Sequence, residues 1–492
     1  MDACVRFRGE MAMANDFGNL DVLVIGGGNA ALCAAITALE NGASVLILEC
    51  SPKSLRGGNS RHTRNMRLAH EKQIDPYTGA YPADEMWNDY MRCTGGMTDP
   101  ELAKMTVYES SSVLDWMRAQ GVRFQPALAG TLHLSRTNAW FLGGGKSLMN
   151  TLYRRAEALG ARVLYDAEAI DLDIKDGRFR SATVRINGQN TVQIAAKTVV
   201  IAAGGLQSDL EFLKGAWGAA SDNFQIRGTP FDTGTMVKVL LAAGAESVGD
   251  PSQGHMVPCD SRSPKFDGGI VTRLDCVTLG LVVNKAGDRF YDEGEDFWGF
   301  RYAIWGRLVA QQQDQICYCF VDSKTINKFM PSRYPAIKGN TIGEVASQFG
   351  LPVEKVEATI AEFNRAVQPG TFNHAILDDC KTAGVTPTKT HWAQRLDTPP
   401  FYGYPLSPGL TFTYFAVKVD RRAAVLMKGG QSAENIFAAG EVMAGNILPK
   451  GYIGGIGLVI GNIFGRIAGK EAATLAKRSA AVASKEATYA AK

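Results

Sequence analysis

The chain has 492 residues, of which 46% are hydrophobic and 21% are charged. This length exceeds what one compact core usually holds, so we expect two or three structural units. The 52 Lys and Arg residues nearly balance the 49 Asp and Glu residues, which excludes a protein that binds nucleic acid through its overall charge.

Nine cysteines occur without any CxxC pair, so neither a disulfide framework nor a zinc ribbon is indicated. We therefore predict a reduced, cytoplasmic setting and no metal site, with Cys317 and Cys319 packing on one face of a strand. Residues 1–19 lack the long apolar segment of a secretory signal and are predicted to be a tail, in which Met11 or Met13 is an alternative start. No run of about 18 apolar residues occurs, so we expect no transmembrane helix.

The first element predicted in chain order is a dinucleotide-binding unit at residues 21–50, DVLVIGGGNAALCAAITALENGASVLILEC. An apolar strand leads into a Gly-x-Gly-x-x-Ala turn, which a helix and a second strand follow, and this context makes the short motif specific. Gly26 allows a tight turn, Gly28 lets a phosphate approach the backbone, and Ala31 lets the helix pack closely. Pyrophosphate is expected at the helix N-terminus, where free N–H groups attract anions. A βαβ unit without a ligand is the alternative.

Later segments favour FAD over NAD. Glu49 follows the second strand, about 20 residues after the glycines, and suits a ribose 2′-hydroxyl. The segments TVVIAAGGLQSD (198–209) and ENIFAAGEVMAG (434–445) each contain an apolar strand that closes on glycine, and a glycine-rich turn within 451–469 opens a C-terminal helix. NAD alone would not need these returning segments, so we predict FAD, with the positive end of the last helix toward the flavin. The residues predicted to contact FAD are Gly26, Gly28, Asn29, Ala30, Ala31, Glu49, Cys50, Gly57, Gly58, Asn59, Ser60, Ala169, Ala203, Gly204, Gly205, Gly440, Glu441, Gly457 and Leu458.

Residues 141–150, FLGGGKSLMN, look like a phosphate-binding P-loop. The P-loop pattern needs a glycine at the position that Trp140 occupies, so we reject this interpretation. We predict instead a glycine turn that begins a helix at 146–159.

Together with the first glycine motif, the segments GGNS (57–60), AAGG (202–205) and AAGE (438–441) resemble the flavoprotein subunits of the fumarate reductase/succinate dehydrogenase family. The resemblance covers about residues 20–475, and GGNSRHTRN, GDRFYDEGEDFW and RYAIWGRLVAQQ are most similar to FAD-dependent tricarballylate dehydrogenases. It implies oxidation of a CH–CH bond beside carboxylates to C=C, as from tricarballylate to cis-aconitate, with a small polycarboxylate as substrate.

The same resemblance implies an α/β fold in which an α+β capping domain interrupts a Rossmann-like FAD-binding domain. A helical pattern at 341–367 and a Pro/Gly-rich return at 398–409 suit such a cap. The active site is expected where the cap meets the flavin. The expected units are a tail at 1–19, the FAD-binding domain at 20–244 and 391–475, the capping domain at 245–390, and a C-terminal tail at 476–492.

The resemblance also implies catalytic roles. Such enzymes move a proton through an arginine that follows a basic-Phe-x-x-Glu segment, here residues 289–293, and Arg301 takes this role by similarity. An arginine needs a neighbouring group to relay the proton, for which Asp275 and Arg273 are the candidates. A salt bridge on the helix surface is the alternative for Arg301.

By the same similarity, His255 and Thr272 correspond to positions that bind substrate carboxylates, with a structural histidine as the alternative for His255. Two fumarate reductase features are absent, because FTYFA (412–416) lacks their histidine and PKGYIGG lacks their arginine. Carboxylate binding is therefore expected to be redistributed, which argues against simple fumarate or succinate chemistry. The candidate replacements are Arg64, Arg136, Lys450, Tyr452 and Tyr414.

Residues 55–67, LRGGNSRHTRNMR, contain four arginines. We consider a nucleic-acid patch, an anion pocket beside the cofactor, and a covalent FAD anchor at His62. The balanced overall charge removes the first, and no nucleic-acid partner is expected. Because GGNS is similar to the non-covalent relatives and places Ser60 at the attachment position, FAD is expected to be bound non-covalently. Arg64 is expected to face an anionic substrate.

Other functions remain open at this point: an enoate reductase, a tetrapyrrole-pathway flavoprotein, a ketosteroid-type desaturase using Tyr291, Tyr302 and Tyr414, or a flavin-binding redox module without turnover. Iron–sulfur, haem and membrane motifs are absent from the sequence, so an external electron acceptor is expected. In the resembling system, the acceptor is a membrane-associated iron–sulfur/haem protein. Such a partner would hold the cytoplasmic chain at the inner face of the membrane.

Overall fold

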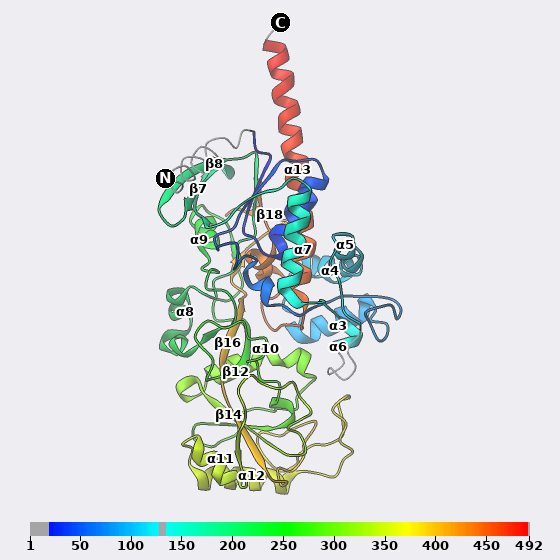
Figure 1. Ribbon diagram of the computed structural model, residues 1–492, viewed down its shortest axis with the longest axis vertical. Helices are drawn as coiled ribbons and strands as arrows, with labels where there is room; N and C mark the ends of the chain where they lie inside the picture. The colour runs from blue at the N-terminus through cyan, green and yellow to red at the C-terminus, as the bar shows by residue number, and fades with distance from the viewer. Residues whose placement is uncertain (1–18, 127–133, 491–492) are drawn as a thin grey trace, which may run out of the picture.

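The computed structural model describes residues 19–126 and 134–490 (Figure 1). The predicted N-terminal tail, with Met11 and Met13, lies outside this description except for Asn19. A parallel sheet with helices occupies the upper part of Figure 1, and a second sheet with its own helices occupies the lower part. This arrangement confirms the predicted α/β class.

A six-stranded sheet forms the upper part, in the order β18-β19-β9-β1-β2-β5. All strands are parallel except β18, which runs antiparallel to β19. The four residues of β1, β2 and β9 are fully buried, as expected for a parallel sheet covered on both faces. The strands are β1 (Val22–Ile25), β2 (Val45–Leu48), β5 (Arg162–Leu164), β9 (Thr198–Ile201), β18 (Ala424–Leu426) and β19 (Ser432–Ala438).

Helices α2 (Asn29–Glu40) and α13 (Ile456–Ala490) pack closely on this sheet. Gly461, Gly465 and Gly469 line the contact at intervals of one helical turn. A Cβ atom at Gly465 would lie 2.5 Å from the carbonyl oxygen of Ala30, and one at Gly469 would lie 2.2 Å from that of Ala34. Only glycine therefore permits this backbone approach. Because α13 continues to residue 490, the predicted C-terminal tail at 476–492 is helical over most of its length.

The second sheet has the order β10-β16-β14-β13, and β12 and β15 also pair with β16. Its centre is β16, a 13-residue strand that runs along the axis of the lower part in Figure 1. Because β10 and β16 lie outside 245–390, this sheet extends beyond the predicted cap on both sides, and the cap boundaries stay a prediction. The elements are β10 (Gln225–Ile226), β12 (Gly254–Asp260), β13 (Leu281–Asn284), α10 (Trp298–Ala310), β14 (Cys317–Asp322), β15 (Ile337–Gly339), α11 (Ile342–Gln348), α12 (Val353–Ala366) and β16 (Phe401–Thr413).

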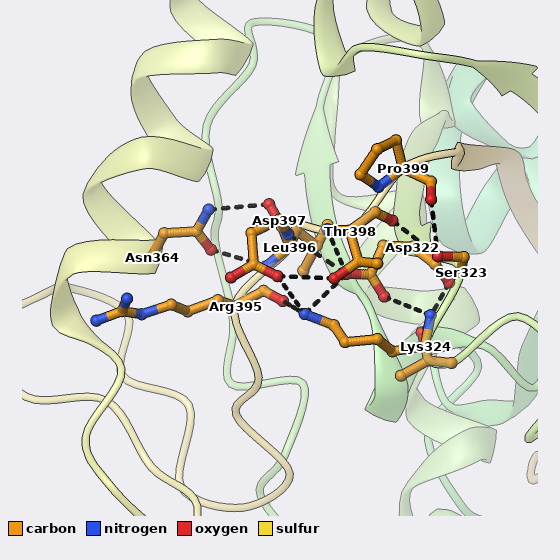
Figure 2. A network of polar contacts seen from close by, with 10 residues as sticks. Asp322, Ser323, Lys324, Asn364, Arg395, Leu396, Asp397, Thr398 and Pro399 are labelled. Atoms are coloured by element: carbon orange, nitrogen blue, oxygen red, sulfur yellow. Dashed lines mark hydrogen bonds and ion pairs between the residues drawn. The ribbon is translucent and has the colours of Figure 1, made fainter.

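A polar network attaches the returning chain to this second sheet (Figure 2). Lys324 donates to the carbonyl oxygen of Arg395 at 2.7 Å and also pairs with Asp322, at 3.0 Å, and with Asp397. The side-chain amide of Asn364, on α12, exchanges two hydrogen bonds with the backbone of Leu396, at 3.0 and 2.8 Å. The helical pattern predicted at 341–367 therefore appears as two helices, α11 and α12, and Asn364 anchors α12 to the segment that precedes β16.

The other elements connect or flank the two sheets. The predicted helix at 146–159 is α7 (Gly144–Ala158). Within residues 19–126 and 134–490, every helix is too short or too polar to cross a bilayer. The remaining helices are α3 (Ala83–Thr94), α4 (Pro100–Glu109), α5 (Val113–Ala119), α6 (Leu134–Thr137), α8 (Leu210–Trp217) and α9 (Thr235–Ala242). The remaining strands are β3 (Asn65–Arg67), β4 (Asn138–Trp140), β6 (Ala167–Lys175), β7 (Arg178–Ile186), β8 (Asn190–Ala195), β11 (Ser247–Val248) and β17 (Ala416–Val417).

The approach of α2 and α13 can be tested with one methyl group. Gly469→Ala should destabilise the fold by about 3 kcal/mol, because the added methyl overlaps backbone atoms of α2. The matched control is Gly215→Ala on α8, where an added Cβ meets no atom within 4 Å. That control should be neutral or stabilise by up to about 1 kcal/mol, since alanine favours the helix. Unfolding midpoints of both variants check this, and equal midpoints would contradict it.

Candidate active site

The N-terminus of α2 opens onto a large cavity. Residues from both sheets and from the loops that connect them line this cavity. Gly26 has φ of +112°, and a Cβ there would lie 2.2 Å from the carbonyl oxygen of Ala202, so the turn requires glycine. The first turn of α2 has neither a capping side chain nor an acidic residue, and the Asn29 N–H donates to Ser60 Oγ at 3.1 Å. Uncapped N–H groups facing a cavity suit the pyrophosphate of a dinucleotide.

Glu49 lines the cavity at the end of β2 and is 3% exposed. Its carboxylate accepts hydrogen bonds from the Ser51 N–H at 2.9 Å, the Gly57 N–H at 3.1 Å and the Tyr153 hydroxyl at 3.3 Å. Besides facing the cavity, as expected for a ribose contact, it therefore holds the loop between β2 and the GGNS segment. The sequence motif does not indicate this second role.

Two further carboxyl groups face the cofactor side of the cavity. Glu441 accepts from the Thr413 N–H at 2.9 Å, and Gln207 Nε2 donates to Asp232 at 2.7 Å and to Glu441 at 3.3 Å. Burial, followed by the charge of Asp232, raises the pKa of Glu441, and burial, followed by the charge of Glu49, raises the pKa of Asp232. A carboxyl group that keeps its proton can donate to ligand hydroxyls as well as accept from them.

Most residues predicted to contact FAD line this one cavity. They are Gly26, Gly28, Asn29, Ala30, Glu49, Cys50, Gly58, Asn59, Ser60, Ala169, Ala203, Gly204, Gly440, Glu441, Gly457 and Leu458. Ala31, Gly57 and Gly205 are not among its lining residues and lie behind the wall, where a Cβ at Gly57 would meet Met149 and one at Gly205 would meet Glu441. The glycine cradle, the uncapped helix end and the carboxyl groups fit FAD.

Three arginines line the other half of the cavity. Arg273 is fixed by Asp275 through two hydrogen bonds of 2.7 Å. Arg227 donates to the carbonyl oxygen of Gly269 and to the Thr411 hydroxyl, each at 3.0 Å. Arg64 donates only to the weak acceptor Met330 Sδ, at 3.3 Å, among the described residues.

Among the described residues, Asp275 is the one carboxylate that forms an ion pair with these three arginines. The repulsion between their positive charges is therefore only partly compensated. Burial and the charge of Arg273 lower the pKa of Arg64 to about 9. Burial and the charge of Arg273 likewise lower the pKa of Arg227. This half of the cavity therefore carries excess positive charge, which an anionic ligand would neutralise.

An aromatic wall completes the cavity. The rings of His255 and Tyr452 stack at a centroid distance of 4.0 Å, and Tyr302 meets His255 edge-on at 5.2 Å. His255 Nε2 is buried without a partner among the described residues. Burial, followed by the charges of Arg227 and Arg273, lowers the pKa of His255 well below its ordinary value, so the imidazole is neutral and can hydrogen-bond a ligand.

Two residues predicted to serve catalysis, Arg301 and Asp275, lie outside the cavity lining. Arg301 pairs with Glu295 at 3.0 Å, and the next residue of α10, Tyr302, lines the cavity instead. Successive residues of a helix point about 100° apart, so one helix face cannot present both. Asp275 acts behind Arg273 and also accepts from Trp298 Nε1 at 2.7 Å.

Four predicted substrate-binding residues are also absent from the lining. Arg136 pairs with Glu85 and donates to the carbonyl oxygen of Ala80 at 2.7 Å, so its charge is already used outside the site. The Thr272 hydroxyl donates to Asp267, the Tyr414 hydroxyl donates to the carbonyl oxygen of Gly451 at 2.7 Å, and Lys450 is exposed. His255, Arg273, Arg64 and Tyr452 do line the cavity, as expected.

Sequence reasoning missed Arg227 and Asp232, and it considered Tyr302 only for the steroid alternative. Arg227 follows the short strand β10, and Asp232 lies in the turn before α9. Neither position belongs to a motif with a fixed spacing, so no local signal marks them. His62 also lines the cavity, and burial with the charges of Arg61 and Arg227 lowers its pKa to about 4. No group of three or more His, Cys, Asp or Glu residues in the described part could hold a metal ion.

The chain matches the protein family described as FAD binding domain over residues 21–458. It is 25% identical to the NADH:acrylate oxidoreductase of Vibrio harveyi, over 93% of this chain and 50% of that protein, and thus spans about half its length. The open conformation of a flavocytochrome c3 fumarate reductase has a TM-score of 0.72 and 21% identity, over 96% of this chain and 81% of the other. A 3-ketosteroid-Δ4-(5α)-dehydrogenase from Rhodococcus jostii RHA1 has a TM-score of 0.70 and 20% identity, over 94% and 99%.

The two solved structures share the fold at low identity, whereas the family match covers most of this chain. The matched range begins at the strand before the glycine turn and ends at Leu458, in the first turn of α13, so it contains both helix ends that face the cavity. The chain therefore belongs to the FAD binding domain family.

Proposed function

We propose that the chain oxidises a CH–CH bond beside the carboxylates of a small polycarboxylate, as in the conversion of tricarballylate to cis-aconitate. The observation that carries this proposal is the excess positive charge of Arg64, Arg227 and Arg273 in one half of the cavity. Three guanidinium groups match a substrate with several carboxylates, since each can bind one in a bidentate manner.

In the proposed reaction, different residues of the cavity would bind, orient and polarise the substrate. FAD, when bound, supplies the two-electron acceptor. The arginines bind and orient the carboxylates, and their charge stabilises the electron-rich carbon that loses its proton. Neutral His255 adds a hydrogen bond through Nε2 without adding charge.

We assign proton transfer to the Tyr302 hydroxyl in place of Arg301. The hydroxyl donates no hydrogen bond within the described residues, and the ring lies 4.9 Å below the Arg273 guanidinium. Burial raises the pKa of Tyr302, while Arg273, Arg227 and Arg64 oppose the rise and would stabilise a tyrosinate. The deprotonated side chain, a tyrosinate, would accept the substrate proton in the oxidative direction, and the neutral hydroxyl would donate a proton in the reductive direction.

Reduction of an enoate is the second candidate function. The similarity to a protein named NADH:acrylate oxidoreductase supports it, because acrylate is a small unsaturated carboxylate that the same arginines would bind. A neutral steroid is a poorer match, since it would leave the buried guanidinium groups without a counterion.

We also propose an external electron partner, because bound FAD must be reoxidised or reduced between turnovers. Eight cysteines among the described residues are free thiols, which supports a reducing, cytoplasmic setting. The polycarboxylate substrate, the partner and this location are proposals for the full-length protein, whose relative in Vibrio harveyi is about twice as long.

Anaerobic addition of tricarballylate to the FAD-loaded protein tests the proposal. The absorbance of oxidised flavin should bleach with tricarballylate and stay unchanged with a neutral steroid of the androstenedione type. If acrylate oxidises the dithionite-reduced protein and tricarballylate leaves the oxidised protein unchanged, the reductase function replaces the dehydrogenase function. Bleaching by the steroid alone contradicts both.

Removing the Arg64 charge should weaken substrate binding. Arg64→Gln is expected to raise KM about 10- to 100-fold with little loss of FAD, because one charge-assisted hydrogen bond to a carboxylate disappears. Arg136→Gln is the control, since its charge is paired with Glu85 outside the cavity, and its KM should not change. Steady-state kinetics measure both, and equal KM values would remove Arg64 from the substrate site.

Removing the Tyr302 hydroxyl should slow turnover about 10²- to 10⁴-fold. In the oxidative direction, wild-type kcat should rise about tenfold per pH unit between about pH 7 and 9, since the required tyrosinate becomes more abundant toward its raised pKa. Tyr302→Phe should lose this slope while retaining FAD. Arg301→Gln should keep both turnover and slope, and the reverse pattern would restore the role to Arg301.

A further inference from the structure

A second, basic hollow lies on the surface at the start of α7. It is lined by Arg56, Gly143, Lys146, Ser147, Asn150 and Arg154. Lys146 and Arg154 are exposed, and none of the three cations forms an ion pair with a carboxylate of residues 19–126 or 134–490. Arg56 is held in place, because it donates to the Tyr165 hydroxyl at 2.6 Å and to Asn150 Oδ1 at 3.1 Å. The result is a hollowed patch of uncompensated positive charge.

The side chain of Tyr153 connects this hollow to the cofactor cavity: Arg56 lies 4.3 Å from its ring centroid, and its hydroxyl donates to Glu49, which lines the cavity, at 3.3 Å. On the inner side, Gly58, Asn59, Ser60 and His62 of the loop at 58–62 line the cavity. On the outer side, the same loop packs against the first turn of α7, where a Cβ at Gly145 would lie 2.3 Å from the Ser60 carbonyl oxygen. Lys146 directly follows this contact. The basic hollow therefore lies beside the loop that lines the cofactor cavity, on α7 and Arg56.

We propose that the basic hollow is the docking surface for an acidic electron-carrier protein. Positive charge without local partners attracts an acidic surface and raises its association rate. Docking there would place the carrier beside the side of the cofactor cavity that Glu49 lines, with Tyr153 between Arg56 and Glu49. This proposal takes one point from the proposed function, namely that bound FAD exchanges electrons with a partner protein.

Because the charge of the basic hollow is uncompensated, the salt dependence of electron transfer is the first property to measure. Association through exposed charges is screened within about 10 Å at 0.1 M salt, so electron transfer to or from an acidic carrier should slow as salt rises. Transfer to a small neutral or cationic mediator should not show the same dependence. Lys146 and Arg154 are suitable positions for charge reversal, because both are exposed and neither lines the cofactor cavity.

Stopped-flow reduction of the FAD-loaded protein by reduced flavodoxin, an acidic electron carrier, tests the proposal without any organic substrate. The Lys146→Glu/Arg154→Glu variant should be reduced at least about tenfold more slowly than wild type at low ionic strength. The same variant should react with reduced methyl viologen at the wild-type rate. Because no substrate is present, failure of this test and failure of the proposed dehydrogenase reaction are distinguishable.

The matched control is Lys214→Glu/Lys428→Glu, which changes the net charge equally at exposed positions on α8 and after β18. Flavodoxin should reduce this control at close to the wild-type rate. Equal slowing of both double variants would mean that only net charge matters, and would overturn the proposal. Inhibition by inorganic phosphate beyond that of NaCl at equal ionic strength would assign the hollow to a small anion instead, and would also overturn it.

Discussion

The close backbone contact between α2 and α13 is the constraint on which the rest of the site depends. Gly461, Gly465 and Gly469 remove the side chains that would keep the helices apart. The Asn29 side-chain amide then donates to the Leu458 carbonyl oxygen at 3.0 Å, which ties the first turns of the two helices together. Both N-termini consequently face one cavity, and their dipoles add to its positive potential. A chain segment more than 400 positions later thus completes a site that begins near residue 26.

Charge is distributed unevenly along that cavity, and burial is the reason. On the cofactor side, burial raises the pKa values of Asp232 and Glu441, so these carboxyl groups do not cancel the helix dipoles. On the opposite side, Arg273 and the other hydrogen-bond donors hold the pKa of Asp275 below its usual range despite burial, so that one carboxylate stays ionised. Asp232 and Glu441, whose pKa values are raised, therefore lie with Glu49 on the cofactor side, and uncompensated guanidinium groups line the opposite half of the cavity.

The second sheet is coupled to this chemistry through β16. This strand pairs with the other strands of the second sheet along most of its length, and its last residue, Thr413, donates to Glu441. The polar network of Lys324 and Asn364 anchors the chain just before β16 begins (Figure 2). One continuous strand therefore connects the second sheet to the carboxyl group of Glu441 in the cavity.

The sequence by itself determined the cofactor half of the site. The glycine turn, the strand before it and Glu49 after the second strand are short-range features, and backbone sterics with phosphate chemistry permit few other solutions. The position of Cys317 and Cys319 is a short-range feature as well, because side chains alternate along β14 and these two therefore share one face of the strand.

Only the tertiary structure decided which residues line the half of the cavity that contains the arginines. The sequence analysis assigned proton transfer to Arg301, but the orientation of α10 places the neighbouring Tyr302 in the cavity lining while Arg301 pairs with Glu295. Arg136 lies outside the cavity lining because it pairs with Glu85, which is 51 residues away in the sequence. Arg227 entered it from β10, a two-residue strand that pairs with β16. Local patterns specify backbone geometry, whereas the direction and partners of a long charged side chain depend on residues that only folding brings together.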